Sequence, residues 1–141
     1  MRVVLWVLQG LLAAQFLFHG YLFVAPPPDI VEQMNAAFPP QLRLFIGVAE
    51  LLAAVGLILP AATRILPWLT PLAAAGLMIV TGSATVYHLF RGETQNAIYT
   101  AVLFVLLTFV AYMRWRVYPV APRTRTETVP AQEGVGEDRA A

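Results

Sequence analysis

The sequence lacks cysteine and lysine and contains few charged residues. The absence of cysteine from 141 residues excludes disulfide exchange, iron–sulfur clusters and thiolate metal sites. Charged residues make up 12% of the chain, against about a quarter in an average soluble domain. All nine basic residues are arginine, and the net charge of +1 gives no reason to expect a nucleic-acid partner. Together these features argue against a soluble enzyme and against a DNA-binding protein.

Hydrophobic residues account for 59% of the chain and gather in long runs instead of alternating with polar ones. Four runs, over about residues 3–24, 42–59, 67–90 and 96–115, approach the ~20 residues that a helix needs to cross a bilayer. Their connections are short, so consecutive helices should be antiparallel neighbours. We therefore predict an all-α integral membrane protein, a four-helix transmembrane bundle with up-down-up-down topology over residues 1–118. The first run is too long for the hydrophobic region of a signal peptide, so we expect it to remain a span.

Proline and polar residues mark the connections between the runs. Three consecutive prolines, residues 26–28, stop the first helix. Asp29 and Glu32 follow with the spacing of a capping box, and apolar residues then recur at every fourth position. This pattern predicts a short interfacial helix over about residues 29–38, or else an irregular loop. The tail over residues 119–141 is rich in Pro, Thr, Glu and Arg without an apolar period, which predicts disorder.

Arginine is distributed unevenly between the two sides of the predicted bundle. One side carries Arg2, Arg64, Arg114, Arg116, Arg123 and Arg125. The other side carries only Arg43 and Arg91, which we interpret as interfacial anchors. The positive-inside rule then predicts that both termini are cytoplasmic. Because arginine is the only basic residue type and Ala and Pro are abundant, we expect a bacterial protein of the inner membrane.

Few polar side chains lie inside the four runs, and each is energetically unfavourable in lipid. The candidates for ligand binding or proton handling are Glu50, His88, His19, Thr81, Thr85 and Gln15. A rise of about 1.5 Å per residue places all of them in the outer half of the membrane. Glu50 should be protonated, or paired with a His or an Arg inside the bundle.

Packing is the alternative role for each of these side chains. Glu50 could hold neighbouring helices together as a protonated group, and His19 could simply bond Gln15 or a backbone carbonyl. His88 could contact headgroups and water at the interface. The threonines could bond carbonyls of their own helix, as Ser and Thr often do in membrane helices.

Three stretches of the sequence carry a resemblance to a known family. They are GVAELLAAVGLILP over residues 47–60, RILPWLTPLAA over residues 64–74, and HLFRGE over residues 88–93. These stretches resemble the DoxX-like family of small four-helix membrane proteins. The most specific features are the glutamate in the middle of a span and the His-x-x-Arg-Gly-Glu turn. The resemblance implies a compact membrane bundle. Most members of that family have no assigned activity, and some relatives are named as subunits of quinone-reducing oxidoreductases.

Two functional hypotheses from different classes follow. In the first, the protein is a membrane subunit of a redox or quinone-associated system, with a polar pocket in the outer half and an oxidoreductase partner subunit. In the second, it is a non-catalytic anchor or scaffold for a partner protein. No NAD, flavin or metal motif is present in the sequence, and no metal site is predicted. We expect no catalytic activity of the chain on its own and assign no catalytic residue.

Two further hypotheses receive less support from the sequence. Haem held between His19 and His88 would suit imidazoles in a bundle, but their predicted depths differ by about a helical turn. A transporter built from four helices and one acidic group would need a homo-oligomer, and the two halves of the sequence show no inverted repeat.

Overall fold

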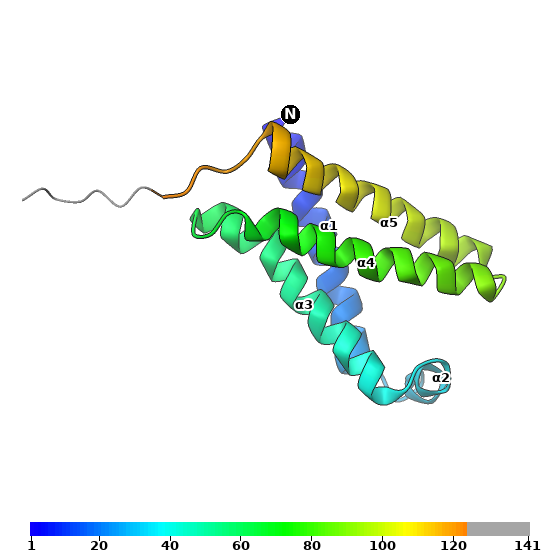
Figure 1. Ribbon diagram of the computed structural model, residues 1–141. Helices are drawn as coiled ribbons and strands as arrows, with labels where there is room; N and C mark the ends of the chain where they lie inside the picture. Colours follow the sequence, from blue (N-terminus) through cyan, green and yellow to red (C-terminus); the bar gives the residue numbers. More distant parts are fainter. Residues whose placement is uncertain (124–141) are drawn as a thin grey trace, which may run out of the picture.

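The computed structural model describes residues 1–123, and this part of the chain is helical without any strand (Figure 1). Its elements in chain order are α1 (Arg2–Val24), α2 (Val31–Ala37), α3 (Pro40–Thr63), α4 (Leu69–Phe90), α5 (Thr94–Tyr112) and the π-helical turn η1 (Met113–Val117). The prediction of an all-α four-helix bundle is confirmed. The predicted disorder of the tail falls largely on residues 124–141, outside the described residues.

Four of the helices are long and apolar enough to cross a membrane. They are α1, α3, α4 and the continuous segment Thr94–Val117, with mean hydropathies between 1.6 and 2.2 over their best windows. Large apolar side chains cover the outside of the bundle; Ile79 is 73% exposed and Phe90 is 88% exposed. Such a surface is unfavourable in water and suits contact with lipid.

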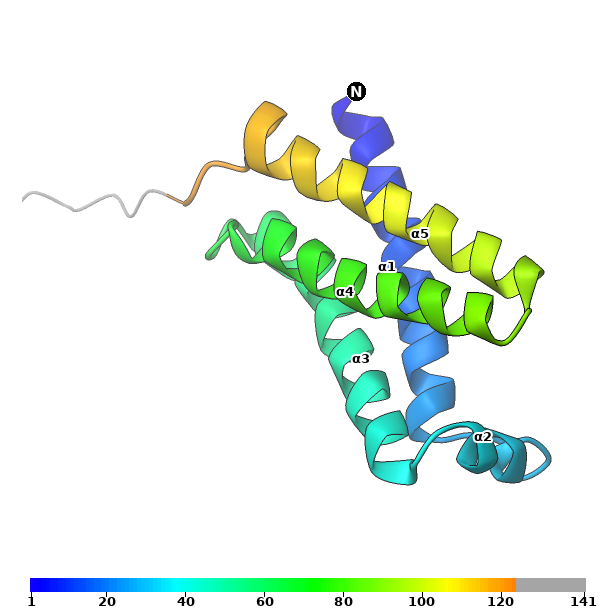
Figure 2. The same cartoon turned by 45° about the vertical axis from the view of Figure 1, so that its right-hand side comes forward.

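The four long helices form two antiparallel pairs, α1 with α3 and α4 with α5, and α3 also packs on α4. Figures 1 and 2 show the two pairs crossing near the N-terminus and diverging toward α2 and the α4–α5 turn. We call the end at which the two pairs cross the N-terminal end of the bundle. α2 lies at the far end of the α1–α3 pair, beyond the ends of both helices.

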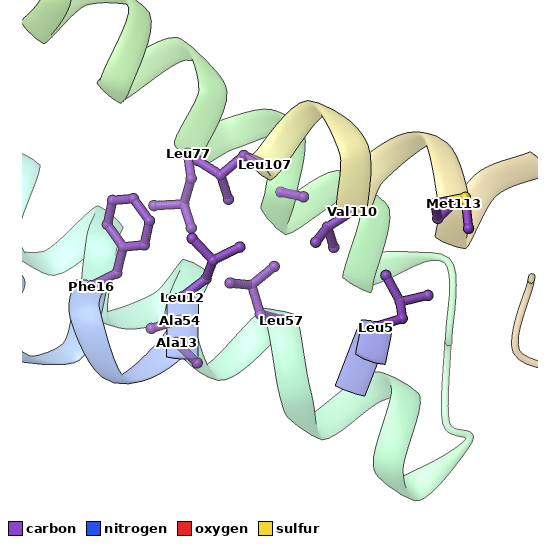
Figure 3. Close-up of a cluster of buried hydrophobic side chains, with 11 residues drawn as sticks. Leu5, Leu12, Ala13, Phe16, Ala54, Leu57, Leu77, Leu107, Val110 and Met113 are labelled. Atoms are coloured by element: carbon purple, nitrogen blue, oxygen red, sulfur yellow. The ribbon is translucent and has the colours of Figure 1, made fainter. Parts of the chain in front are cut away.

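The hydrophobic core lies where the two pairs cross (Figure 3). Leu57 of α3, Leu77 of α4 and Leu107 of α5 are fully buried there. They pack with Leu5, Leu12, Ala13, Phe16, Ala54, Ala74, Val110 and Met113. Since lipid tails are as apolar as leucine, close van der Waals packing holds such helices together.

Glycines set the closest approach between α1 and α3. A Cβ atom on Gly20 would lie 2.9 Å from the carbonyl oxygen of Gly47, and one on Gly47 would lie 2.8 Å from Cβ of Phe23. Larger residues at these two positions would therefore separate the helices. The crossing brings the neighbouring side chains of His19 and Glu50 within bonding distance.

Several helix ends differ from the sequence-based expectation. The short helix expected over about residues 29–38 forms, but it begins only at Val31 after Ile30 as N-cap, and no side chain caps it. The capping box expected from Asp29 and Glu32 is therefore absent. Pro60, expected just beyond the end of the second span, lies inside α3. A proline inside a helix removes one backbone hydrogen bond and crowds the carbonyl four residues earlier, but the rest of the α3 hydrogen bonds carry the helix on to Thr63.

Candidate functional site

The first polar pair of the site joins α1 to α3. Nδ1 of His19 lies 2.7 Å from Oε2 of Glu50. The carboxyl group is buried at 2% exposure, whereas the imidazole is 42% exposed. Of the two arrangements expected for Glu50, a protonated group or a group paired with a His or an Arg, the contact with His19 corresponds to the second. Because Nδ1 of His19 is occupied, Nε2 is the ring nitrogen that remains for another partner.

The second pair lies at the α4–α5 turn. Nδ1 of His88 lies 2.6 Å from Oε2 of Glu93. Arg91 donates from Nε to Oε1 of Glu93 over 2.7 Å, and Asn96 donates to Oε2 over 3.3 Å. Gly92, with φ of 70°, permits the tight turn that folds the carboxylate back onto the end of α4. Glu93 thus gathers three donors from one short segment.

Hydrogen bonding strongly favours the ionised form of Glu93. The bond from Arg91, followed by those from His88 and Asn96, lowers the pKa of Glu93 from 4.5 to about 2. The same bond to Glu93 raises the pKa of Arg91 above its usual value. Glu93 is therefore a carboxylate at neutral pH, and Nδ1–H of His88 donates to it. This arrangement leaves Nε2 of His88 for a ligand.

An aromatic row connects the two pairs. The ring centroids of His19 and Phe23 lie 4.5 Å apart, and those of Phe23 and Phe38 lie 6.0 Å apart. Phe38 lies 5.1 Å from Tyr87, which lies 5.5 Å from His88. Phe38, which directly follows α2, is thus the link between α1 and α4. The aromatic row thus runs from α1 past the end of α2 to α4.

A cavity of about 460 Å³ lies beside the aromatic row, between α2 and the α4–α5 turn. Its apolar lining consists chiefly of Phe23, Met34, Phe38 and Tyr87. Its polar lining consists of Gln33, His88, Arg91, Glu93 and Asn96. Ligand sites in proteins commonly have this size and this combination of an apolar wall with a few polar groups. We call this cavity the α2 pocket.

Arg43, predicted from the sequence as an interfacial anchor, packs against the C-terminal end of α1. Its side chain is only 7% exposed. Its Nη1 donates to the backbone carbonyl of Phe23, and its Nε has no partner among the described residues. The carbonyls at the C-terminus of α1 attract this cation, because a helix end leaves them unpaired. Arg91, the other predicted anchor, is exposed and binds Glu93.

The remaining candidates mainly bond within the bundle. The hydroxyl of Thr81 donates to the carbonyl oxygen of Leu77 over 2.9 Å. The hydroxyl of Thr85 lies 2.8 Å from the carbonyl oxygen of Thr81 and 2.9 Å from the hydroxyl of Thr100. Gln15 is half-buried, and His19 bonds Glu50 instead of bonding Gln15. These contacts favour a packing role for the threonines and leave Gln15 without an assigned one.

A buried polar cluster at the N-terminal end was missed by sequence reasoning. Arg114 donates from Nε to Oε1 of Gln9 over 2.6 Å, and Gln9 donates to the carbonyl oxygen of Leu57 over 2.6 Å. Both side chains are buried. The sequence did hold a signal: Arg114 falls within the fourth apolar run, where a charge is unusual. The sequence alone predicts for Arg114 only a contribution to orientation.

Glu93 and Tyr87 are also functional candidates that the sequence reasoning did not select. Tyr87 directly precedes His88, and Glu93 ends the His-x-x-Arg-Gly-Glu turn five residues after it. The turn brings the backbone N–H of Glu93 to 2.9 Å from the carbonyl oxygen of His88. The glycine within that motif was the available signal that the carboxylate folds back onto the histidine.

Comparison with known proteins agrees with the resemblance read from the sequence. The model of the DoxX-like family matches residues 7–110, which include most of all four long helices, the α2 pocket and both histidine–carboxylate pairs. No match was found among curated proteins or among solved structures. The chain is therefore a member of the DoxX-like family, and its four apolar helices make it a multi-pass membrane protein.

Proposed function

We propose that this protein is a membrane subunit that binds the polar head of a small amphipathic molecule in the α2 pocket, with a quinone as the leading candidate. One observation carries the proposal: the α2 pocket combines an aromatic wall with the His88–Glu93 pair. An apolar wall suits a ring, and the polar groups suit oxygen atoms on its edge. The divergent helix pairs leave their apolar outer surfaces to lipid, where the tail of such a molecule would lie.

The residues of the α2 pocket fit a quinone head. Phe38 and Tyr87, whose ring centroids lie 5.1 Å apart, supply apolar faces against which a ring can pack. The amide of Asn96 and the imidazole of His88 supply hydrogen-bonding groups for carbonyl oxygens. When bound, a quinone supplies reversible electron and proton transfer. The chain itself supplies the binding, the orientation and the proton-holding groups.

Each histidine has a carboxylate that orients it. Glu93 accepts from Nδ1 of His88 and fixes the orientation of the imidazole. Arg91 keeps Glu93 ionised, so the carboxylate holds Nδ1–H of His88 and leaves Nε2 as the ring nitrogen available to a ligand. Glu50 orients His19 in the same way at the other end of the aromatic row. The two imidazoles are therefore the groups that we assign to proton handling.

The geometry argues against one haem shared by His19 and His88. The aromatic row places Phe23, Phe38 and Tyr87 as successive contacts between the two imidazoles. Each histidine also already binds its own carboxylate through Nδ1. Bis-histidine ligation needs two imidazole nitrogens about 2 Å from a single iron. A quinone head needs no such pairing of the two histidines.

Electrons must enter through a partner under this proposal. The sequence carries no NAD, flavin or metal motif, so an oxidoreductase subunit would hold the redox centre. We further propose that both termini are cytoplasmic in a bacterial inner membrane, following the arginine distribution. The α2 pocket would then open near the outer surface, where a partner subunit or a second copy of the chain could contact α2.

Direct titration tests the proposal. Purified protein in mild detergent is titrated with a short-tailed quinone, and binding is followed by calorimetry. Saturable binding is expected, and His88→Ala should weaken it about tenfold, the value of one good hydrogen bond to a charged or polar group. Val86→Ala is the matched control, because Val86 is exposed on the same helical turn and does not line the α2 pocket. Absence of saturable binding to the wild-type protein would refute the proposal.

A non-catalytic scaffold is the second candidate, and the α1–α3 contact favours it. The His19–Glu50 bond lies beside the Gly20–Gly47 crossing and ties two helices together. Such bonds between membrane helices contribute about 0.6–2 kcal/mol to helix association. If Glu50→Leu lowers the folded yield in detergent as much as it lowers any partner-linked activity, packing explains this residue. If the yield is unchanged and binding is lost, the ligand role explains it.

A further inference from the structure

The N-terminal end of the bundle buries a guanidinium that has no carboxylate partner among residues 1–123. Arg114, in the first turn of η1, is only 6% exposed. The acidic side chains of the described chain are Asp29, Glu32, Glu50 and Glu93, and all four belong to the half of the molecule nearer α2. A buried charge without a counter-charge is strongly unfavourable, so an anion is the expected missing component.

Neutral groups hold Arg114 in place without cancelling its charge. Its Nε donates to Gln9 over 2.6 Å, and its Cζ lies 4.7 Å from the centroid of the Trp6 ring. Gln9 in turn is anchored on the carbonyl oxygen of Leu57. Nη2 of Arg114 is buried and has no hydrogen-bond partner within the described chain. The guanidinium is therefore oriented on one edge and unsatisfied on another.

A second unsatisfied polar atom lies at the same end of the bundle. Oγ1 of Thr70 is fully buried and has no partner among the described residues. Thr70 belongs to the first turn of α4, and α4 packs against η1. Arg2, Arg64 and Arg116 are exposed at this end and add positive charge around it. Donors of this kind match the acceptor oxygens and the negative charge of a phosphate group.

The depth of Arg114 suits a phosphate at the membrane surface. It lies three residues before Val117, the end of the fourth span, and hence about 5 Å from that end at ~1.5 Å per residue. Figures 1 and 2 show the start of α1 and the end of α5 meeting at this level. Trp6, Trp115 and Tyr118 lie here as well, as expected for side chains at an interface. Lipid phosphates occupy this layer.

We propose that Arg114 is the centre of a binding site for a phosphate group at the N-terminal end, supplied by an anionic phospholipid or by free phosphate. The bound group would accept from the unsatisfied Nη2 of Arg114 and neutralise its charge. This site is separate from the α2 pocket, and its test does not depend on the function proposed for that pocket. Binding of the anion would also tie α1, α3 and η1 together through Gln9.

The test uses Trp6 as a reporter. In the full chain, Trp68→Phe and Trp115→Phe leave Trp6 as the only indole, and both replaced residues are exposed. Delipidated protein in nonionic detergent is titrated with brominated phosphatidylglycerol or brominated phosphatidylcholine, and in a separate arm with inorganic phosphate. We expect quenching of Trp6 to saturate at about tenfold lower mole fraction of the anionic lipid, corresponding to about 1.4 kcal/mol.

Matched variants locate the site. Arg114→Gln should abolish the preference for the anionic lipid, whereas Arg116→Gln, which removes an exposed arginine two residues away, should retain it. Gln9→Glu supplies a carboxylate beside Arg114 and should likewise remove the preference, which provides a test if Arg114→Gln does not fold. A saturable change in Trp6 fluorescence with inorganic phosphate would show that free phosphate is sufficient to fill the site. Response to the anionic lipid alone identifies the lipid as the source.

Three results would overturn the proposal. The first is equal quenching by both lipids with no response to phosphate. The second is an unchanged preference in folded Arg114→Gln or Gln9→Glu. The third concerns the acidic residues of the tail, Glu127, Glu133, Glu137 and Asp138. A full-length variant carries Gln or Asn in place of these four residues. If this variant prefers the anionic lipid and the wild-type chain does not, a carboxylate of the chain itself occupies the site.

Discussion

His19 and Glu50 are 31 residues apart in the sequence, yet Nδ1 of the first lies 2.7 Å from Oε2 of the second. The close crossing of Gly20 on Gly47 makes this contact possible. The pair lies at one end of the aromatic row, and the His88–Glu93 pair lies at the other. Phe38 carries the connection between them. The stability of the α1–α3 crossing and the chemistry of the α2 pocket are therefore linked through a few side chains.

Gly20→Ala should destabilise the bundle. The new Cβ would lie 2.9 Å from the backbone oxygen of Gly47, and a backbone atom cannot rotate away. Overpacking of this kind typically costs about 1–3 kcal/mol. Gly76→Ala is the matched control, because a Cβ there meets nothing within 4 Å. Thermal unfolding in detergent, followed by circular dichroism, should show a lower Tm for Gly20→Ala only. Equal Tm values for both variants would contradict the crossing described above.

Substitutions of Glu50 should separate hydrogen bonding from charge. Glu50→Gln retains a group that can bond Nδ1 of His19, whereas Glu50→Leu removes it. Loss of one buried partner is expected to lower the unfolding free energy by about 1–3 kcal/mol. The leucine variant should therefore unfold at lower temperature than the glutamine variant, and both can be compared in the same detergent. A leucine variant more stable than wild type would show that the pair is not needed for packing.

The turn at Glu93 should make part of the stability depend on pH. Hydrogen bonds, first from Arg91, lower the pKa of Glu93 from 4.5 to about 2 in the folded protein. The unfolded chain binds a proton first as pH falls, so the contribution is fully present above about 4.5 and is lost between 4.5 and about 2. Arg91→Gln removes the largest cause and should raise the pKa of Glu93. Carbon-detected NMR of the carboxyl group measures this, and an unchanged midpoint would contradict the assignment.

Phe38→Ala should weaken ligand binding in the α2 pocket by removing the link between α1 and α4. The substitution deletes one aromatic wall and opens the contact with Tyr87. Truncation of a large buried anchor in a binding site commonly costs about 2 kcal/mol or more. A fall of about thirtyfold in quinone affinity is therefore expected. Phe90→Ala is the control, because Phe90 is 88% exposed and does not line the pocket. Equal affinities would place the ligand elsewhere.

The sequence predicted the number of spans because long apolar runs leave little choice of environment. It predicted less well where helices end. The sequence predicts that Pro60 ends the second span, yet α3 continues past it, because the loss of one backbone hydrogen bond does not by itself end a helix. The depth of each polar residue could be estimated from its distance along the helix. The pairing of His19 with Glu50 could not, because it depends on which faces of two helices meet.

The arginines show the same limit. Arg114 and Arg116 are two residues apart and looked equivalent as inner-side charges. In the structure Arg114 is buried against Gln9 and Trp6, whereas Arg116 is exposed. Arg43 likewise lies buried against the end of α1, whereas Arg91 is exposed. Rotation of a helix about its axis decides such differences, and packing against neighbours sets that rotation. Counting the arginines on each side of the bundle gives no information on this rotation.

The most direct test of the account is to identify what the α2 pocket holds in the native membrane. The full chain is purified in mild detergent, its absorbance spectrum is recorded, and extracted lipophilic molecules are identified by mass spectrometry. We expect wild-type protein to carry a quinone in stoichiometric amount. The Phe38→Ala variant should lose the quinone, and the Phe90→Ala variant should retain it. Wild-type protein that carries only bulk lipid, in the same amount as both variants, would contradict the binding function and favour the scaffold.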